Sequence, residues 1–363
     1  MKKILYLMNV DWNWIKQRPH FLAEQLTYYY DLTVVNQYRY TKKGYQSRKF
    51  DGKFVSFKVI PRIDRYTSLR WINVILKRKI IKNLMASENP DYIWITDPDQ
   101  INWLPKNLGK IDLIYDCMDD HYGLSSGEKK KENILISERK LCERCKYLFV
   151  SSSYLTEILK KRYGDSLSSK ITVIRNGYDG NLEELSELGE NSADNSKFTA
   201  AYFGTIAEWF DFDLLKKSLY DFDNLEYRLI GPTAHGIVVP ENSRIKHIGT
   251  VEHKDLYKNI EDVDCLIMPF KLTDSIKAVD PVKLYEYINF GKNIICIGYQ
   301  EVSRFEPYAY FYNDYKGYKD VLKTLMTMKK LKYTNNMRIA FLADNTWKVR
   351  GKLIADTLGI TGN

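Results

Sequence analysis

The sequence contains no uninterrupted apolar run of about 18 residues, the shortest stretch expected to cross a bilayer as a helix. Its opening residues, MKKILYLMNVDWNW, include charged and polar side chains within ten positions, so they predict neither a membrane span nor a signal peptide. Cysteine is also scarce. The five cysteines are an odd number spread thinly along 363 residues, which argues against a disulfide framework and favours a reducing cytoplasm. Internal repeats and low-complexity segments are absent, so we expect ordinary globular domains.

One pair of cysteines has the spacing of two metal ligands. Cys142 and Cys145 form a C-x-x-C motif, but they lie in a charged helical run, ERKLCERCKY, without a second pair. A structural zinc site needs four ligands. We therefore expect no metal centre at these cysteines.

The length of the chain suits two domains of about 150 to 180 residues, and its 44% apolar content supports a core in each. Charge divides unevenly between the halves. Residues 1–176 carry 32 Lys and Arg against 19 Asp and Glu, whereas the remainder carries 23 against 27. The basic first half could meet nucleic acid, anionic lipid or a phosphorylated substrate.

The first half predicts a parallel sheet with helices between its strands. Residues 3–10 form a buried strand that opens into a polar loop, followed by a helix over 17–29 with Pro19 in its first turn. This arrangement aims Gln17, Arg18 and the loop at the ligand edge of the sheet. Further strands are expected over residues 32–36, 54–60, 92–96, 112–117, 147–152 and 171–176.

Residues 62–86 predict a strongly basic helix. Seven Lys or Arg and a single acidic residue, Asp64, lie between Arg62 and Lys82, interleaved with apolar residues that include Trp71 and Ile72. Such a helix can lie in the interface of an anionic membrane. It can equally pack its apolar face on the sheet and expose its lysines, and both can hold for different turns of one helix.

An acidic cluster follows the strand predicted at 112–117. It consists of Asp116, Asp119, Asp120 and His121. Mutual repulsion among three neighbouring carboxylates raises the pKa of at least one of them, as a general base requires. The alternative is an acidic loop whose first aspartate caps the next turn.

The second half restarts the strand and helix pattern, with strands expected over 199–203, 227–230, 245–248, 265–270 and 293–299. Gly204 and Thr205 follow the first of these strands, Gly231 follows the second, and Ile248 ends the third. Glycine at such a turn permits close approach of a ligand to the backbone.

Residues 280–291, DPVKLYEYINFG, predict a helix between two buried strands, with Pro281 in its first turn and Gly291 at its end. Lys283 and Glu286 then lie near its start, where a doubly wound sheet binds its ligand. The helix dipole and Lys283 favour phosphate, and Glu286 can accept hydrogen bonds from two ribose hydroxyls. The predicted ligand is a nucleotide.

Short motifs in a consistent order resemble those of bacterial glycosyltransferases with the GT-B fold, in the branch that assembles surface polysaccharides such as teichuronic acid and capsule. They are the run Trp14, Gln17, Arg18 and Pro19, then Y-D-x-x-D-D at 115–120, V-S-S-x-x-L at 150–155, V-I-x-N-G-x-D at 173–179, F-G-T-x-x-x-W-F-D at 203–211 and P-x-K-x-x-E-Y at 281–287. The resemblance implies two Rossmann-like, doubly wound parallel-sheet domains that face each other across a cleft. It implies an acceptor domain over residues 1–177, a linker over 178–197, a donor-nucleotide domain over 198–340, and a C-terminal helical segment, 341–363, that returns to the first domain.

The same resemblance implies the substrates and the roles of residues. The donor would be a nucleotide-sugar, most commonly UDP-linked, and the acceptor a polyprenyl-linked glycan, with no metal and no separate cofactor. The enzyme would sit peripherally on the cytoplasmic face of the membrane, which residues 62–86 would contact. Donor-binding residues would be Gly204, Thr205, Gly231, Ile248, Asp280, Lys283, Tyr285 and Glu286. Acceptor-binding residues would be Asn13, Arg18 and His121, and Asp119 would be the catalytic base beside Asp116 and Asp120.

Several alternatives stay open. Many retaining members carry a glutamate eight positions before the nucleotide-binding one, where this chain has Ala278, so either inversion or retention is compatible with the sequence. Asp97 and Asp99 form a D-x-D that would suit a metal-dependent, single-domain transferase, but that architecture leaves the second half unexplained. A sugar-nucleotide epimerase would need no acceptor. An RNA-binding protein would suit the basic charge, but no recognition motif supports it, and we expect no nucleic-acid partner.

Overall fold

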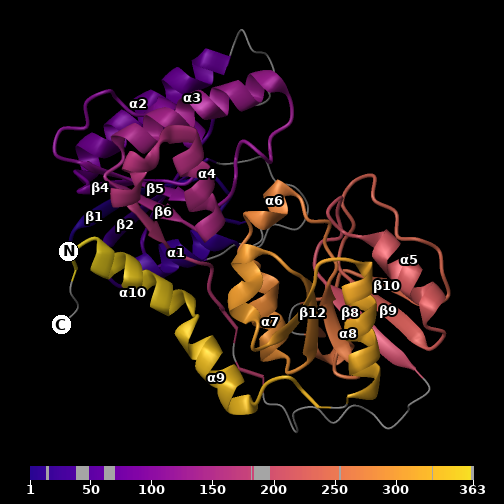
Figure 1. The fold of residues 1–363 in the computed structure, drawn as a ribbon. Coiled ribbons are helices and arrows are strands. Elements are labelled where there is room, and N and C mark those ends of the chain that lie inside the picture. Colours follow the sequence, from indigo (N-terminus) through magenta and orange to yellow (C-terminus); the bar gives the residue numbers. More distant parts are fainter. Residues whose placement is uncertain are drawn as a thin grey trace. The chain divides into compact units, whose positions relative to one another are not determined.

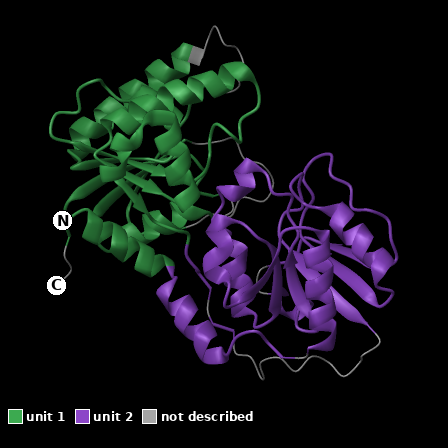
Figure 2. Cartoon of the chain, viewed as in Figure 1, with its two compact units in different colours: residues 1–176, 347–363 green, residues 177–346 purple. Residues whose placement is uncertain are grey.

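The computed structural model divides the chain into two compact units (Figure 2). Unit 1 consists of residues 1–176 with 347–363, and unit 2 of residues 177–346. The structure describes residues 1–13, 16–37, 49–60, 70–180, 182–183, 197–252, 255–328 and 330–360. Each unit has its own parallel sheet and its own buried core, which confirms the predicted α/β architecture (Figure 1).

The sheet of unit 1 has seven parallel strands in the order β3-β2-β1-β4-β5-β6-β7. Their bounds are β1 Lys3–Met8, β2 Asp31–Gln37, β3 Lys53–Phe57, β4 Tyr92–Ile95, β5 Asp112–Cys117, β6 Tyr147–Val150 and β7 Ile171–Val173. The central strands are buried on both faces, which explains their nearly continuous apolar sequences. The chain runs outward from β1 to β3 and then returns to β4 on the other side of β1. The strand order therefore reverses between β1 and β4, the position where such sheets bind ligands.

Helices cover both faces of this sheet (Figure 1). The unit contains α1 Arg18–Leu26, α2 Arg70–Glu88, α3 Glu128–Arg144, α4 Ser153–Tyr163 and α10 Trp347–Thr357, with the 3-10 turns η2 Pro98–Trp103 and η3 Asp165–Ser169. Figure 1 shows α2, α3 and α4 on one side of the sheet and α1 with α10 on the other. Right-handed crossovers require this division, because α1 connects β1 to β2 and so runs along the sheet in the direction opposite to the connections that contain α2, α3 and α4. Residues 62–69 of the predicted basic helix and Trp14 of the first motif lie outside the described residues.

The last helix of the described chain, α10, packs on α1 at the start of unit 1. The rings of Phe21 and Trp347 stack with centroids 4.9 Å apart and an interplanar angle of 7°. Gly351 lets the two backbones approach, since a Cβ there would lie 2.7 Å from Cβ of Gln25. The C-terminal segment thus completes the core of unit 1.

The sheet of unit 2 has six parallel strands in the order β10-β9-β8-β11-β12-β13. Their bounds are β8 Phe198–Phe203, β9 Leu225–Ile230, β10 Ile245–Gly249, β11 Cys265–Met268, β12 Asn293–Ile297 and β13 Ala309–Tyr312. Its helices are α5 Phe212–Asp221, α6 Asp274–Lys277, α7 Val282–Asn289, α8 Tyr315–Thr327 and α9 Asn335–Asp344, with the 3-10 turns η5 Tyr257–Asn259 and η6 Gln300–Phe305. The strand order reverses between β8 and β11, so β11, the strand before α7, adjoins β8, which Gly204 follows.

Helix α9 belongs to unit 2. Arg338 donates a hydrogen bond of 2.6 Å to the carbonyl oxygen of Asn289 at the end of α7, and Phe341 stacks on Tyr285. The return to unit 1 therefore begins at Trp347 instead of at residue 341. Of the helices that the structure describes, none is both long enough and apolar enough to span a membrane.

Candidate active site

A glycine follows each of β8 and β9, at a position where a side chain would collide with neighbouring groups. Gly204 has φ of 129° and Gly231 has φ of 135°. A Cβ on Gly231 would lie 2.1 Å from the carbonyl oxygen of Gly204, and a Cβ on Gly204 would lie 2.2 Å from Cε of Lys283. Glycine at both positions lets the two turns and the lysine pack together at the carboxyl edge of the sheet.

The backbone amides of this turn are not equivalent. The Gly204 N–H donates to the carbonyl oxygen of Ile230 at 2.8 Å, so Gly204 provides space for a ligand but no donor. Thr205 is exposed, and its amide donates to no other group in the described part of the chain. Its carbonyl oxygen accepts a hydrogen bond of 2.8 Å from the Tyr202 hydroxyl, which fixes the turn. The Thr205 N–H is thus available to an anion.

Lys283 brings a half-buried ammonium group to the same turn. Its Nζ would lie 2.9 Å from a Cβ on Gly204 and is 6.0 Å from the centre of the Tyr202 ring. Burial lowers the pKa of Lys283, and the charge of Glu286 offsets part of that effect. Within the described residues Lys283 forms no ion pair. A desolvated cation of this kind gains stability when an anion binds beside it.

Glu286 lies three residues after Lys283, on the same face of α7. Its side chain is half-buried, and its charge partly opposes the lowering of the Lys283 pKa and adds to the effect of burial, which raises the pKa of Tyr178. The helix thus presents a cation followed by an anion at the carboxyl edge of the sheet. This order is the one that the sequence predicts for phosphate and ribose.

Two other predicted donor residues are occupied within the protein. Asp280 is 2% exposed and forms an ion pair with Arg304 of η6. The hydroxyl of Tyr285, which is fully buried, donates to Asp280 Oδ2 at 3.3 Å, and Arg304 Nη2 donates to that hydroxyl at 2.6 Å. Asp280, Tyr285 and Arg304 therefore brace the start of α7, and their side chains face the core. We restrict the proposed donor contacts to the residues of the turns and of the exposed face of α7.

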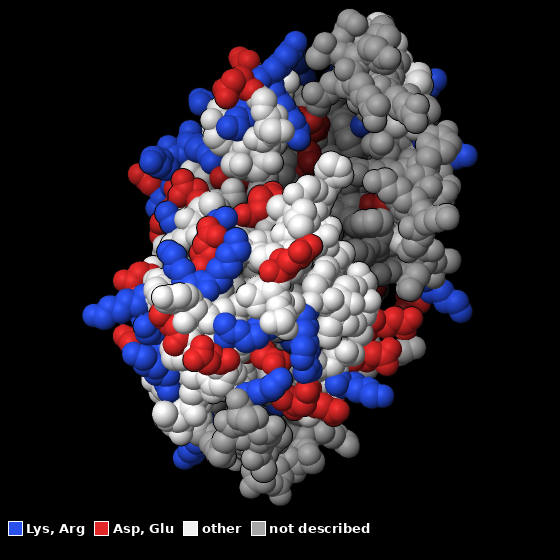
Figure 3. All heavy atoms as spheres, turned by 90° about the vertical axis from the view of Figure 1, so that its right-hand side faces the viewer, with Lys and Arg blue, Asp and Glu red and all other residues white. Residues whose placement is uncertain are grey.

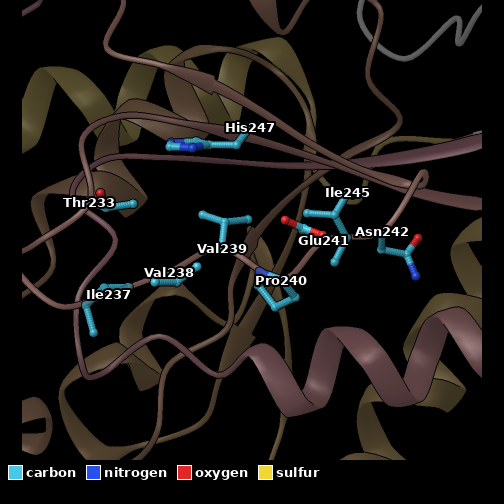
Figure 4. Close-up of a pocket in the computed structure, with 9 residues that line it drawn as sticks. All are labelled: Thr233, Ile237, Val238, Val239, Pro240, Glu241, Asn242, Ile245 and His247. Carbon is cyan, nitrogen blue, oxygen red and sulfur yellow. The ribbon is translucent and has the colours of Figure 1, made fainter.

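The end of β10 adjoins the Gly231 turn. The Gly231 N–H donates to Gly249 O at 2.7 Å, and His247 Nε2 donates to Gly231 O at 2.8 Å. Ile248 is 45% exposed and offers an apolar surface at this strand end, where we expect the nucleotide base. A hollow of about 580 Å³ lies nearby, and His247, Thr233 and residues 237–242 are among the residues that line it (Figure 4). That hollow contains none of the predicted donor residues.

In unit 1, the predicted site residues Arg18 and Asp116 pair with each other. Arg18 Nη2 donates to Asp116 Oδ1 at 2.8 Å and Nε donates at 3.1 Å, while both side chains are at least nine-tenths buried. Arg18 Nη1 also donates to the carbonyl oxygen of Ile174 at 2.6 Å. This pair ties the start of α1 to β5 and to the end of β7. Neither charge is left to contact a substrate directly.

Asp119 differs from both neighbouring aspartates. Asp120 forms a bidentate ion pair with Arg162 of α4, at 2.7 and 3.0 Å. The half-buried Asp119 carboxylate has no hydrogen-bond partner among the described residues. Burial raises its pKa, while His121 and Arg18 oppose the shift and Asp116 and Asp120 add to it. The pKa of Asp119 is therefore raised, but burial is the main cause, and the repulsion among carboxylates that the sequence suggests contributes less.

His121 lies beside this carboxylate. Its backbone N–H donates to the Asp119 carbonyl oxygen at 2.9 Å, and its buried Nε2 has no partner among the described residues. An unsatisfied buried ring nitrogen has a free energy cost unless a ligand binds it. His121 is therefore suited to hold a hydroxyl near Asp119.

Asn13 lies in the loop between β1 and α1. Its N–H donates to Asp11 Oδ1 at 3.0 Å, and the buried ring of His20 supports the loop from below. Gln17 N–H donates to His20 Nδ1 at 3.1 Å, which leaves Nε2 as the donor to the carbonyl oxygens of Asp11 and Trp12, each 3.2 Å away. The neutral imidazole holds Asn13 at the ligand edge.

The site predicted from the sequence does not include three residues that position its side chains. They are His20, Arg162 and Arg304. Arg162 lies 42 residues from its partner Asp120, and Arg304 lies 24 residues from Asp280. No local motif marks such distant pairs. His20 alone has a local signal, since it stands three residues after Gln17 in the first turn of α1.

Two doubly wound parallel sheets, with glycine turns and a lysine at the ligand edge of the second, define the GT-B class of fold. Comparison with solved structures confirms this class. HepE from Anabaena, in complex with UDP and glucose, covers 99% of this chain and 100% of its own, with a TM-score of 0.69 and 14% identity. The lipopolysaccharide outer core galactosyltransferase WaaB covers 99% of each chain, with a TM-score of 0.66 and 12% identity.

Among curated proteins, the chain is similar to one from Bacillus subtilis (strain 168) named "Putative teichuronic acid biosynthesis glycosyltransferase TuaH". The two are 25% identical over 285 residues, which cover 73% of this chain and 70% of the relative. No protein-family profile matches the chain. These relatives confirm the predicted resemblance to bacterial glycosyltransferases with the GT-B fold.

Proposed function

We propose that this protein transfers a glycosyl group from a UDP-linked sugar to a polyprenyl-linked glycan in the synthesis of a bacterial surface polysaccharide. Lys283 carries the proposal, because its desolvated ammonium lies against the Gly204 turn without an ion pair to any described residue. A diphosphate supplies the charge that this site lacks. The UDP and glucose in the HepE complex and the name of TuaH support the class of donor and the pathway.

The donor residues act on the leaving group. The Thr205 N–H and Lys283 would bind the diphosphate, and Glu286 would accept hydrogen bonds from the ribose hydroxyls. When the bond between the anomeric carbon and the diphosphate oxygen breaks, negative charge builds on that oxygen. Lys283 stabilises this charge in the role that a metal ion has in other transferases. We therefore propose catalysis without a metal or a separate cofactor.

Asp119 acts on the acceptor. Its carboxylate takes the proton from the attacking hydroxyl, whose oxygen forms the new bond to the anomeric carbon as the bond to the nucleoside diphosphate breaks. The products are the extended glycan and UDP. A single displacement with a base on the acceptor side inverts the anomeric configuration, so the proposal favours inversion over retention.

Helix α2 is the proposed contact with the cytoplasmic face of the membrane. Trp71 is 58% exposed and Ile75 is 52% exposed, one helical turn apart, while Ile81 is buried against the sheet. Arg78, Lys79 and Lys82 are exposed on the same helix. Exposed aromatic and aliphatic side chains beside cations suit an anionic bilayer surface. The proposal thus combines the two alternatives that the sequence leaves open. The turns with Trp71 and Ile75 would contact the membrane, and the turn with Ile81 packs inside unit 1.

The surface of unit 2 around α5 gives little support for a nucleic-acid partner. Figure 3 shows acidic and basic side chains interspersed over the face that carries α5, without a continuous basic surface. Non-specific binding to nucleic acid depends on clusters of Lys and Arg that neutralise phosphates. Because charges of both signs alternate on this face, it lacks the cluster of cations that binding to phosphates would need.

Calorimetric titration of UDP tests the proposal. Glu286→Ala removes the acceptor for the ribose hydroxyls and should weaken UDP binding by about 1 to 3 kcal/mol. Glu241→Ala is the matched control, because Glu241 is an exposed carboxylate of the same unit that lines the hollow in Figure 4. Unchanged affinity in Glu286→Ala, or loss in Glu241→Ala, would move the donor site away from α7. Turnover of the UDP-sugar without any acceptor would favour an epimerase.

A further inference from the structure

A second cavity lies in unit 1, at the point where the strand order of its sheet reverses. Its volume is about 780 Å³. Met8 and Asn9 contribute the end of β1, Asp97 and Asp99 contribute the loop after β4, and α2 and α3 contribute the walls. Ligands of doubly wound sheets bind at this position. None of the site residues predicted from the sequence lines the cavity.

The walls of the cavity are cationic. Lys77 and Arg78 of α2 line it, as do Lys129 and Lys130 in the first turn of α3. Lys129 and Lys130 are exposed and form no ion pair with any residue that the structure describes. Arg78 Nη2 donates to Asn102 O at 2.9 Å, which directs the guanidinium along the wall. Four cations that converge on one cavity favour an anionic ligand.

The two carboxylates of the cavity accept hydrogen bonds from neighbouring groups. Asp97 Oδ1 accepts the N–H of Asp99 at 2.8 Å and thereby caps η2. The Ser137 hydroxyl donates to Asp99 Oδ1 at 3.5 Å, and Asn102 Nδ2 donates to the Ser137 hydroxyl at 3.0 Å. The D-x-D of the sequence thus builds the floor of the cavity through local hydrogen bonds.

The cavity also connects two features of the proposed function. β4 pairs with β5 through Ile95 and Tyr115, so the loop after β4 lies one strand from the loop that holds Asp119. Trp71 lines the cavity and also belongs to the exposed apolar face of α2. An occupant can therefore lie with one end near the membrane-facing helix and the other near the base.

We propose that this cavity binds the diphosphate of an isoprenyl-linked acceptor. The cations of α2 and α3 hold the two phosphates, the isoprenyl chain leaves along Trp71, and the first sugar extends toward Asp119. This inference rests on the proposed function, because it places the acceptor of that reaction. In this proposal the basic residues of unit 1 have two ligands: the diphosphate of the acceptor and the anionic membrane surface.

Farnesyl diphosphate, a water-soluble isoprenyl diphosphate, tests the site when its binding to the full chain is measured in saturating UDP. The UDP occupies the donor site, so the remaining affinity reports the second site. Lys129→Ala/Lys130→Ala should weaken binding of farnesyl diphosphate about tenfold or more, because two charge-assisted contacts are lost. It should leave UDP affinity unchanged. Lys140→Ala, an exposed lysine of the same helix outside the cavity, is the matched control and should bind as the wild type does.

Two further ligands show whether the cavity recognises the phosphates, the isoprenyl chain or both. Farnesol should bind poorly, since it lacks charge, and inorganic pyrophosphate should bind more weakly than farnesyl diphosphate, since it lacks the chain. Equal affinity of the double variant and the wild type would overturn the proposal, as would equal binding of pyrophosphate and farnesyl diphosphate. Loss of UDP binding in Glu286→Ala is read in a separate titration, so failure of the donor site and failure of this cavity are distinguishable.

Discussion

At the residue scale, the three aspartates after β5 differ in what surrounds each carboxylate. Asp116 is neutralised by Arg18, and Asp120 is neutralised by Arg162. The charges of Arg18, Asp116 and Asp120 act on Asp119, but its carboxylate has no hydrogen-bond partner among the described residues. Burial raises its pKa. Two ion pairs therefore flank one carboxylate with a raised pKa, which is the property that makes Asp119 the proposed base.

We expect Asp119→Asn to bind UDP normally and to lose about 10² to 10⁴ in turnover, because asparagine keeps the volume of the side chain but cannot accept the proton. Turnover is measured with a lipid-linked acceptor at matched donor saturation. Asp116→Asn serves as the comparison. It should cost less in turnover and more in stability, since it leaves the buried Arg18 without its counter-charge. Near wild-type turnover in Asp119→Asn would refute the assignment of the base.

The raised pKa of Asp119 also predicts a stability effect with a definite sign. Because the folded state holds this proton more tightly than the unfolded state, stability falls as the pH rises from the unfolded pKa through the folded pKa. Asp119→Asn removes the ionised form, so the variant should be more stable than the wild type at pH 7. The difference should shrink toward pH 3. Urea denaturation across this range measures it, and a variant that is less stable at pH 7 would contradict the burial of this charge.

The sequence predicts which residue types gather at this edge, but it does not predict how they pair. The cluster at 116–121 is visible because its members are adjacent in the chain. Arg18 lies 98 residues from Asp116, and Arg162 lies 42 residues from Asp120, so only the folded sheet brings each pair together. For this reason Arg18 was expected to contact the acceptor, whereas its guanidinium is enclosed by protein acceptors.

At the element scale, α7 depends on a brace that lies behind it. Its N-cap is Pro281, which makes no side-chain capping bond, and no acidic residue occupies its first turn. Asp280 and Arg304 hold this helix end from the core side instead. The helix that carries Lys283 and Glu286 is therefore positioned by a buried ion pair from a different segment.

Arg304→Gln should lower the free energy of unfolding by about 3 to 5 kcal/mol, because it leaves the buried Asp280 carboxylate without its cation. Asp280→Asn on the same background should restore part of the loss, since no uncompensated charge then remains. Equilibrium denaturation of the two single variants and the double variant measures the coupling. Additive losses would show that the two side chains do not stabilise the fold through their ion pair.

The positions of the strands and helices can be predicted from the sequence more closely than the ion pairs between distant side chains. The central strands were predicted because burial on both faces demands apolar runs, as in YIWI of β4 and CLIM of β11. The short edge strand β13, AYFY, was not among the predicted strands, because four residues of mixed burial give no clear period. The boundary predicted at residue 341 falls inside α9, because the sequence does not reveal that Arg338 and Phe341 of this helix contact α7.

At the scale of the whole molecule, the uneven charge and the exposed face of α2 predict where the protein resides. We expect it to float with vesicles that contain anionic lipid and to be released by salt, since each Lys or Arg near such a surface contributes about 1 kcal/mol that salt screens. Trp71→Ser/Ile75→Ser should weaken this binding. Ile136→Ser is the matched control, because Ile136 is an exposed isoleucine of α3 outside the membrane-facing helix.

Flotation that ignores both lipid charge and salt would count against the membrane contact. Tight, salt-dependent binding to oligonucleotides in place of vesicles would instead favour the nucleic-acid alternative. The two titrations use the same protein and the same range of salt, so they can be compared directly.

The return of α10 to unit 1 has a consequence for the order in which the molecule is made. All of unit 2 is translated between Asn176 and Trp347, so it is a continuous stretch that can fold as it leaves the ribosome. Unit 1 cannot bury Phe21 against Trp347 until that later helix has been synthesised. The half of the protein that is made first is therefore the half that finishes folding last, and its α1 face stays uncovered until α10 has been made.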